Sequence, residues 1–356
     1  MRIVRRGVVG AVVVAAVLAV VAVLAVAASV HFKQPPANTA VGPPLPLQSA
    51  GSLALPGDSS RFDYASLDPS RHLLFIAHLG ASEVIEVDTA TKRVVRVVGH
   101  LDGVHGVLVV PALHRVFATA TNTNEVITLD EDTGSVIGRA PTGAYPDGLA
   151  YEAEQGRIWI TNESGGSQTV LDIATGKVVG TVNVGGDAGN VAYEPGNGTH
   201  PAEILVAVQS RNEVVVIDPA TLTVVKRIRV PGCDHPHGLA LDLHHRLGFI
   251  ACDGNATMHT LDLSTMQIGG FWPVGDSPDV LALDPVTGWL YVAGEGGEVT
   301  IFGGQRPSLT PLGSAHLADG AHIVAVDPIT HLSYYPIPSG SGGSPELLIR
   351  RPITSK

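Results

Sequence analysis

Residues 147–184 read DGLAYEAEQGRIWITNESGGSQTVLDIATGKVVGTVNV, and this stretch divides into four short strand-like runs. The runs GLAY, RIWIT, QTVLD and VVGTVNV are separated by polar segments rich in Gly, Asn, Glu and Thr. Runs of about 4 to 7 residues between such turns are typical of β-strands. Four antiparallel strands in about 40 residues are typical of one blade of a β-propeller.

The same unit occurs seven times along the chain. A polar residue opens each unit, and successive opening residues are 42, 42, 43, 47, 42 and 43 positions apart. A large apolar residue follows twelve positions later in six of the units, and an aspartate ends the third run in five. This agreement predicts an all-β, seven-bladed β-propeller over residues 48–356. The opening residues are Asp63, His105, Asp147, Asn190, His237, Asp279 and His322.

The seventh unit contains only three strand-like runs before the chain ends. The missing outer strand is available in SLAL, residues 52–55, just before the first opening residue. Pairing of this strand with the last blade closes the ring and removes an open sheet edge. We therefore predict one closed domain rather than the two that the length of 356 residues suggests.

The N-terminus differs from the rest of the chain. Residues 1–47 contain no acidic residue, and residues 7–30 form a run of 24 without a charge. Spanning a bilayer takes about 20 apolar residues, and the arginines before the run predict a cytoplasmic N-terminus. We expect a single-pass anchor in the cytoplasmic (inner) membrane at residues 1–30, a Pro-rich linker at residues 31–47, and a propeller outside, periplasmic or extracellular. The alternative is a cleaved signal peptide and a secreted protein, because AVA at residues 25–27 resembles a cleavage site.

Charge and cysteine content exclude several classes of function. The chain has a net charge of −11, and without residues 1–47 it keeps 18 basic and 33 acidic residues, a net charge of −15. No cluster of Lys or Arg favours a nucleic-acid partner. Two cysteines are too few for a four-Cys zinc site or an iron–sulfur cluster. In an exported protein we expect Cys233 and Cys252 to form a disulfide; the alternative is a thiolate ligand or a nucleophile assisted by His237.

Several segments resemble a known repeat family. The segment WITN at residues 159–162 and the segment PDGLA at residues 146–150 have the form of the YVTN-type (YncE-like) β-propeller repeat. The resemblance covers nearly all of residues 48–356 and implies a bacterial or archaeal extracytoplasmic propeller. Seven-bladed propellers related to that family include metal-dependent lactonases, lyases and heavy chains of amine dehydrogenases. Further matching segments are YVAG at 291–294, FIAH at 75–78, PHGLA at 236–240 and IDPAT at 217–221.

The seven opening residues are candidates for a binding site. In a propeller the innermost strands begin around the mouth of the central channel, so these polar side chains share one rim. Three of them are His and three are Asp, which are ligands for a divalent metal ion. A second tier from the ends of the second strands lies at the same face, and Glu163, Asp253 and Glu295 belong to it. The other members of that tier are His78, Asn162 and Gln209.

The sequence leaves two interpretations of the polar rim residues open. These residues either bind a ligand, with His105, His237 and His322 as candidate metal ligands, or hydrate the channel and cap backbone N–H groups. The segment CDHPHG at residues 233–238 is the most site-like local feature, although one His-x-His pair is weak support for a metal.

The leading hypothesis for function is a binding module that takes a small-molecule ligand or a protein partner at this rim. The alternative is a metal-dependent lactonase or lyase with His237 and His322 as candidate catalytic residues. Whether the protein is an enzyme stays open.

Overall fold

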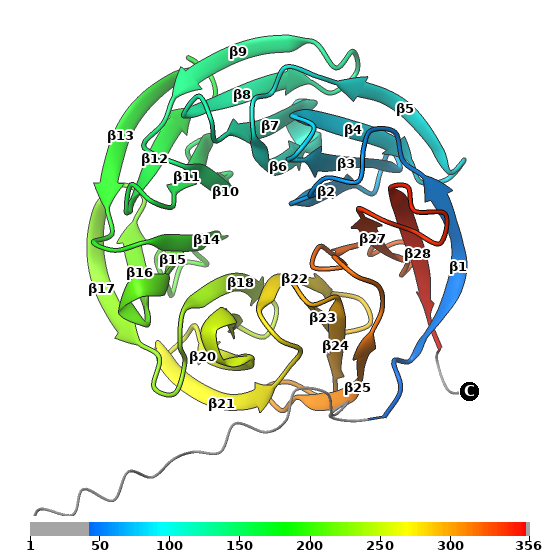
Figure 1. The fold of residues 1–356 in the computed structure, drawn as a ribbon. Coiled ribbons are helices and arrows are strands. Elements are labelled where there is room, and N and C mark those ends of the chain that lie inside the picture. Colours follow the sequence, from blue (N-terminus) through cyan, green and yellow to red (C-terminus); the bar gives the residue numbers. More distant parts are fainter. Residues whose placement is uncertain (1–42, 354–356) are drawn as a thin grey trace, which may run out of the picture. The chain divides into compact units, whose positions relative to one another are not determined.

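Seven sheets of four antiparallel strands form a ring in the computed structural model, which describes residues 43–353 (Figure 1). The predicted seven-bladed β-propeller is therefore confirmed. In each sheet the strands run outward from the centre in chain order, except in the last blade. The innermost strands are β2 (Ala65–Asp68), β6 (Val104–Val110), β10 (Pro146–Glu152), β14 (Ala188–Glu194), β18 (Pro236–Asp242), β22 (Pro278–Asp284) and β26 (Ala325–Val326).

The second and third strands of each blade are buried on both faces because they lie between the neighbouring blades. The second strands are β3 (Leu73–His78), β7 (Arg115–Ala120), β11 (Arg157–Asn162), β15 (Glu203–Val208), β19 (Leu247–Cys252), β23 (Trp289–Gly294) and β27 (Ser333–Ile337). The third strands are β4 (Glu83–Asp88), β8 (Glu125–Asp130), β12 (Ser167–Asp172), β16 (Glu213–Asp218), β20 (Thr257–Asp262), β24 (Glu298–Gly303) and β28 (Glu346–Pro352).

The outer strands are the exposed layer, and their side chains alternate between the blade and the solvent. In β5, for example, RVVRVV alternates between exposed and half-buried positions, as expected of a strand with one wet face. The outer strands are β1 (Leu47–Ala54), β5 (Arg93–Val98), β9 (Val136–Pro141), β13 (Lys177–Asn183), β17 (Thr223–Arg229), β21 (Gln267–Pro273) and β25 (Thr310–His316). Three short 3-10 helices complete the described elements: η1 (Pro111–Leu113), η2 (Gln209–Arg211) and η3 (Asp253–Asn255).

The recurrent apolar position is the core of each blade. All six large residues that the spacing places there are at most 3% exposed. The recurrent aspartates form Asx turns after the third strands: the Asp88 carboxylate accepts hydrogen bonds from the N–H groups of Ala90 and Thr91, both at 2.9 Å. The six core residues are Phe75, Phe117, Trp159, Phe249, Tyr291 and Tyr334.

The ring is closed by strands from opposite ends of the chain. β1 pairs with β28 antiparallel, from Leu47 opposite Pro352 to Ala54 opposite Glu346 (Figure 1). The predicted closure is confirmed, but the strand begins at Leu47 and ends at Ala54, so it is longer than the predicted segment at residues 52–55.

The described chain already contacts the propeller before β1 begins. The N–H of Ser314 donates to the carbonyl oxygen of Pro43 at 3.1 Å, and the N–H of Ile353 donates to that of Pro46 at 2.7 Å. The end of the predicted linker thus belongs to the propeller. Residues 1–42, with the predicted anchor, lie outside the described residues. Within residues 43–353 no helix has the length and apolar character needed to cross a membrane.

A disulfide joins Cys233, in the loop before β18, to Cys252, at the end of β19. The two Cα atoms are 5.4 Å apart and the bridge closes 19 positions of sequence. Both cysteines are buried. The bridge therefore ties the loop of residues 231–235 to the second strand of its own blade.

Replacing both cysteines by alanine should lower the free energy of unfolding by about 2–4 kcal/mol, because the unfolded chain loses a constraint on a loop of this length. Urea denaturation without reductant measures this effect. The same titration of the unmodified chain with dithiothreitol is the control and should show a similar loss. An unchanged midpoint in the double variant would contradict the stabilising role of the bridge.

Candidate functional site

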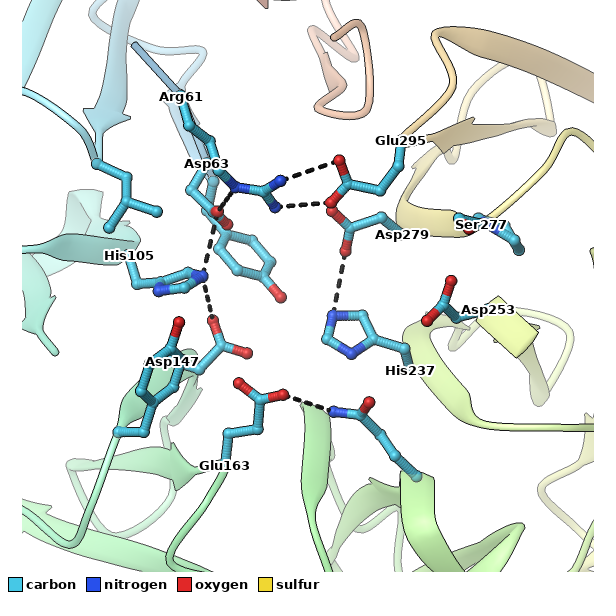
Figure 2. Close-up of a pocket in the computed structure, with 15 residues that line it drawn as sticks. Arg61, Asp63, His105, Asp147, Glu163, His237, Asp253, Ser277, Asp279 and Glu295 are labelled. Carbon is cyan, nitrogen blue, oxygen red and sulfur yellow. Dashed lines mark hydrogen bonds and ion pairs between the residues drawn. The ribbon is translucent and has the colours of Figure 1, made fainter.

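A pocket of about 300 Å³ opens at the centre of the ring, where the innermost strands begin (Figure 2). We call this pocket the funnel. Eight of the ten predicted ligand-binding residues line it, and Asn190 and His322 do not. Six residues outside the predicted set and its second tier also line it: Arg61, Tyr64, Leu79, Tyr145, Ser277 and Pro278. The eight predicted residues are Asp63, His105, Asp147, Glu163, His237, Asp253, Asp279 and Glu295.

The local backbone explains why the opening residues reach the centre. In five blades the register between the first two strands shifts at the opening residue, as between Val104 and Val107 or between Pro236 and Leu239. Such bulges bend a strand and redirect a side chain. Gly106 follows one of these residues, and a Cβ there would clash with the carbonyl oxygen of Asp147 in the next blade. A glycine at this place therefore lets adjacent blades approach closely.

Tyr64 forms the floor of the funnel. Its side chain lines both the funnel and a second cavity further along the axis, and its hydroxyl donates a hydrogen bond to the Asn190 side chain. Burial and the surrounding carboxylates raise the pKa of Tyr64 well above its ordinary value, so it remains a neutral phenol. Asn190 lines only the lower cavity. Asn190, a predicted ligand-binding residue, therefore lies outside the funnel and bonds to Tyr64 from below.

Arg61 connects two sides of the funnel. Its Nε donates to Asp63 at 3.0 Å, and its two terminal nitrogens donate to the two oxygens of Glu295 at 2.9 and 2.7 Å. Fork-to-fork contacts of this kind fix the geometry of both partners. The repeat did not reveal Arg61, because no other blade has an arginine two positions before its opening residue.

Two signals in the sequence could have found the missed residues. Tyr64 is aromatic at the position directly after the opening residue, where the other units have Gly, Val or Ile. Arg61 and Tyr145 both lie two positions before an opening residue, and both line the funnel. Positions that vary between repeats therefore contribute to this site as much as the shared ones.

His105 and His237 are held in ion pairs. The Nε2 atom of His105 is 3.1 Å from Asp63 and 3.7 Å from Asp147, and the Nε2 atom of His237 is 3.1 Å from Asp279. Burial alone would lower the pKa of both histidines, but these carboxylates outweigh it and raise the pKa to about 9 for His105 and to about 10 for His237. At neutral pH both rings are imidazolium ions, which donate a proton rather than abstract one.

His322 lies beside the funnel and makes no hydrogen bond. Its side chain is 4% exposed, and its Nδ1 and Nε2 atoms both lack a partner. Its nearest charged neighbours are Glu295, 3.6 Å from Nδ1, and Asp279, 3.9 Å from Nε2. His322 therefore lies next to two lining residues but does not itself line the pocket.

The structure does not gather the three predicted metal-ligating histidines into one cluster. Among residues 43–353, two groups of side chains have the proximity that a metal ion requires. His105 belongs to one, His322 belongs to the other, and His237 belongs to neither. The groups are Asp63 with His105 and Asp147, and Asp279 with Glu295 and His322.

Two carboxylates of the funnel, Glu163 and Asp253, have no cationic partner among the described residues, and a third, Asp147, has only a long ion pair with His105 at 3.7 Å. Glu163 accepts a hydrogen bond from the uncharged Gln209 amide at 3.1 Å, and no residue among those described pairs with the carboxylate of Asp253. Asp147 is 1% exposed, and its Oδ1 atom has no hydrogen-bond partner. Burial raises the pKa of Asp147 to about 6, although His105 and His237 oppose this shift. Figure 2 shows Asp147 and Glu163 on the side of the pocket opposite Arg61.

Comparisons with known proteins identify the fold but not the family. No family model matches the sequence, and no curated protein does. A solved chain of Kuenenia stuttgartiensis hydrazine synthase aligns with a TM-score of 0.68 and 15% identity over 79% of this chain and 94% of that chain. At this identity the likeness shows a shared β-propeller fold alone. The resemblance to the YVTN-type family therefore continues to rest on the repeat residues.

Asp147→Asn should raise the free energy of unfolding at pH 8 by about 1–3 kcal/mol. Because the pKa of Asp147 is raised in the folded chain, the folded state binds this proton more tightly than the unfolded chain does. The cost of ionising it is absent below about pH 4 and complete above about pH 6. The increase in the free energy of unfolding caused by Asp147→Asn should therefore shrink as the pH falls from 8 to 4, which denaturation experiments at each pH would measure. Asp253→Asn is the control, and an equal gain there or no gain at Asp147 would contradict this account.

Proposed function

We propose that this chain is an extracytoplasmic, YVTN-like β-propeller that binds a small cationic ligand in its funnel. One observation carries the proposal: six carboxylates line the pocket, against Arg61, His105 and His237 as the cationic groups. The lining thus stays negative even when both histidines are protonated. In a partly enclosed pocket such an excess of one sign attracts and retains a ligand of the opposite sign.

The shape of the funnel supports a small organic ligand. Its volume of about 300 Å³ is at the lower end of small-molecule sites, and Tyr64 closes it at the bottom. Tyr145 is 39% exposed and adds an aromatic ring to the wall. Aromatic rings and carboxylates together are the groups that recognise ammonium ions. An amine or quaternary ammonium compound fits this chemistry better than an anion does.

The proposed location outside the cytoplasm has separate support. Disulfides persist in oxidising compartments, and this chain contains the bridge between Cys233 and Cys252. The charge-free run at residues 7–30 is consistent with export through a membrane anchor or a signal peptide.

The second candidate function is a metal-dependent lactonase or lyase at the same rim. The observation that favours it is that each of the two side-chain groups described above combines one imidazole with two carboxylates. A metal ion held there would polarise a carbonyl group or activate a water molecule. His237, as an imidazolium ion beside Asp279, would then serve as a proton donor to a leaving group.

Isothermal titration of the full chain tests the cationic ligand. We expect 1,4-diaminobutane and tetramethylammonium to bind and succinate not to bind. Asp147→Asn and Glu163→Gln should each weaken binding of the diamine roughly three- to tenfold, because each removes one negative charge from the lining of the funnel. Added salt should weaken it further.

Glu154→Gln is the matched control, since this exposed residue lies in the turn after β10 and outside the funnel. Preferential binding of succinate would refute the cationic ligand. Equal binding of the diamine by Glu163→Gln and by the unmodified chain would also refute it.

A further inference from the structure

We infer that the side chains of Asp279, Glu295 and His322 bind a divalent first-row transition-metal ion. These three residues are called the His322 cluster below. The inference deepens the second candidate function and rests on it only for the role of the ion. Binding of the ion is a separate property from binding of an organic cation in the rest of the funnel.

The strongest observation is the state of the His322 ring. The side chain is 4% exposed, yet neither ring nitrogen has a hydrogen-bond partner. Most buried polar atoms are partnered, and a buried one that is not calls for an explanation. The nearest carboxylate oxygens are 3.6 Å from Nδ1 and 3.9 Å from Nε2, which is too far for a hydrogen bond. The two distances belong to different ring nitrogens, so an ion would bind one of these nitrogens together with the two carboxylates.

The distances within the cluster fit a metal ion. One ligand atom from each of the three residues lies within 4.8 Å of the others. Bonds of about 2.1 Å to a tetrahedral ion place its ligands about 3.4 Å apart, so the side chains need to move only a little. One imidazole and two carboxylates favour Mn, Fe, Co or Zn over Ca or Mg. Three protein ligands would leave at least one further coordination position for water or a substrate.

Asp279 is held in an orientation that suits a metal ligand. Its Oδ1 atom is paired with His237 at 3.1 Å, and its Oδ2 atom faces His322. A carboxylate that is held on one side by a second group presents its other oxygen in a fixed direction. His237 is therefore a positioning residue for the cluster and not one of its ligands.

Arg61 would compete with a metal ion for the carboxylate of Glu295. Its guanidinium group bonds to both oxygens of Glu295, so a metal ion and Arg61 cannot use this carboxylate equally well. Arg61 is 43% exposed and is also bonded to Asp63, so it has an alternative position away from Glu295. Removal of Arg61 should therefore strengthen metal binding, which is the opposite of what a supporting residue would do.

The other group of potential ligands is less suitable. The Nε2 atom of His105 is already 3.1 Å from Asp63, and its Nδ1 atom is 3.4 Å from the Thr121 hydroxyl. A metal ion would therefore have to replace the proton that Nε2 shares with Asp63 or break the contact of Nδ1 with Thr121. This difference favours His322 as the ligand over His105.

Titration of the full chain with Co²⁺ tests the inference, with visible absorption and equilibrium dialysis as readouts. We expect one ion per chain and a ligand-field spectrum of low coordination number. His322→Gln and Asp279→Asn should each weaken binding by at least about tenfold. Arg61→Ala should strengthen it roughly two- to fivefold, since a partly exposed competing ion pair is lost. His105→Gln is the matched control and should keep the affinity of the unmodified chain.

Four outcomes would overturn the inference. These are full Co²⁺ affinity in His322→Gln, loss of affinity in His105→Gln, unchanged or weaker binding in Arg61→Ala, and tighter binding of Ca²⁺ than of Co²⁺. Circular dichroism and thermal unfolding of each variant separate loss of the site from loss of the fold. Glu163→Gln separates the two proposals, because it should weaken binding of 1,4-diaminobutane and leave that of Co²⁺ unchanged.

Discussion

The pairing of β1 with β28 is the contact on which the rest of the structure depends. It joins the two ends of the propeller domain and turns seven sheets into a closed ring. Each blade buries its second and third strands only between two neighbours, so an open ring would leave the first and last blades with an uncovered face. Closure also sets the diameter of the centre. The funnel exists because seven strand ends are held at one distance from a common axis.

The period of the sequence was sufficient to predict the fold, because each blade repeats the same apolar and turn positions. The same reasoning placed eight of ten candidate residues in the funnel, since the start of the first strand and the end of the second have defined positions in every blade. The other two do not line it, because Asn190 lies beneath the Tyr64 side chain and His322 lies beside the pocket. A repeat predicts where a Cα atom lies but not which side chain occupies the axis. Arg61 was missed for the related reason that no other blade has its equivalent.

Buried charge in the funnel lowers the stability of the folded chain. Asp147 is buried with an oxygen that has no hydrogen bond and only a long ion pair with His105 at 3.7 Å, while Arg61 pairs with Asp63 and Glu295 on the opposite side. A chain selected for stability alone would place neutral side chains there. Perturbed ionisation in a concave pocket is instead typical of functional sites. The pocket and its unpaired charges therefore argue together for binding of a ligand of positive charge.

The floor formed by Tyr64 has a consequence for kinetics. A propeller with an open channel has two exits, whereas here the Tyr64 side chain and its hydrogen bond to Asn190 separate the upper pocket from the lower cavity. A ligand that does not displace the Tyr64 side chain leaves the funnel by the mouth through which it entered. The rate of release is thus controlled at a single face of the protein, and a partner that covered this face would retain the bound molecule without touching it.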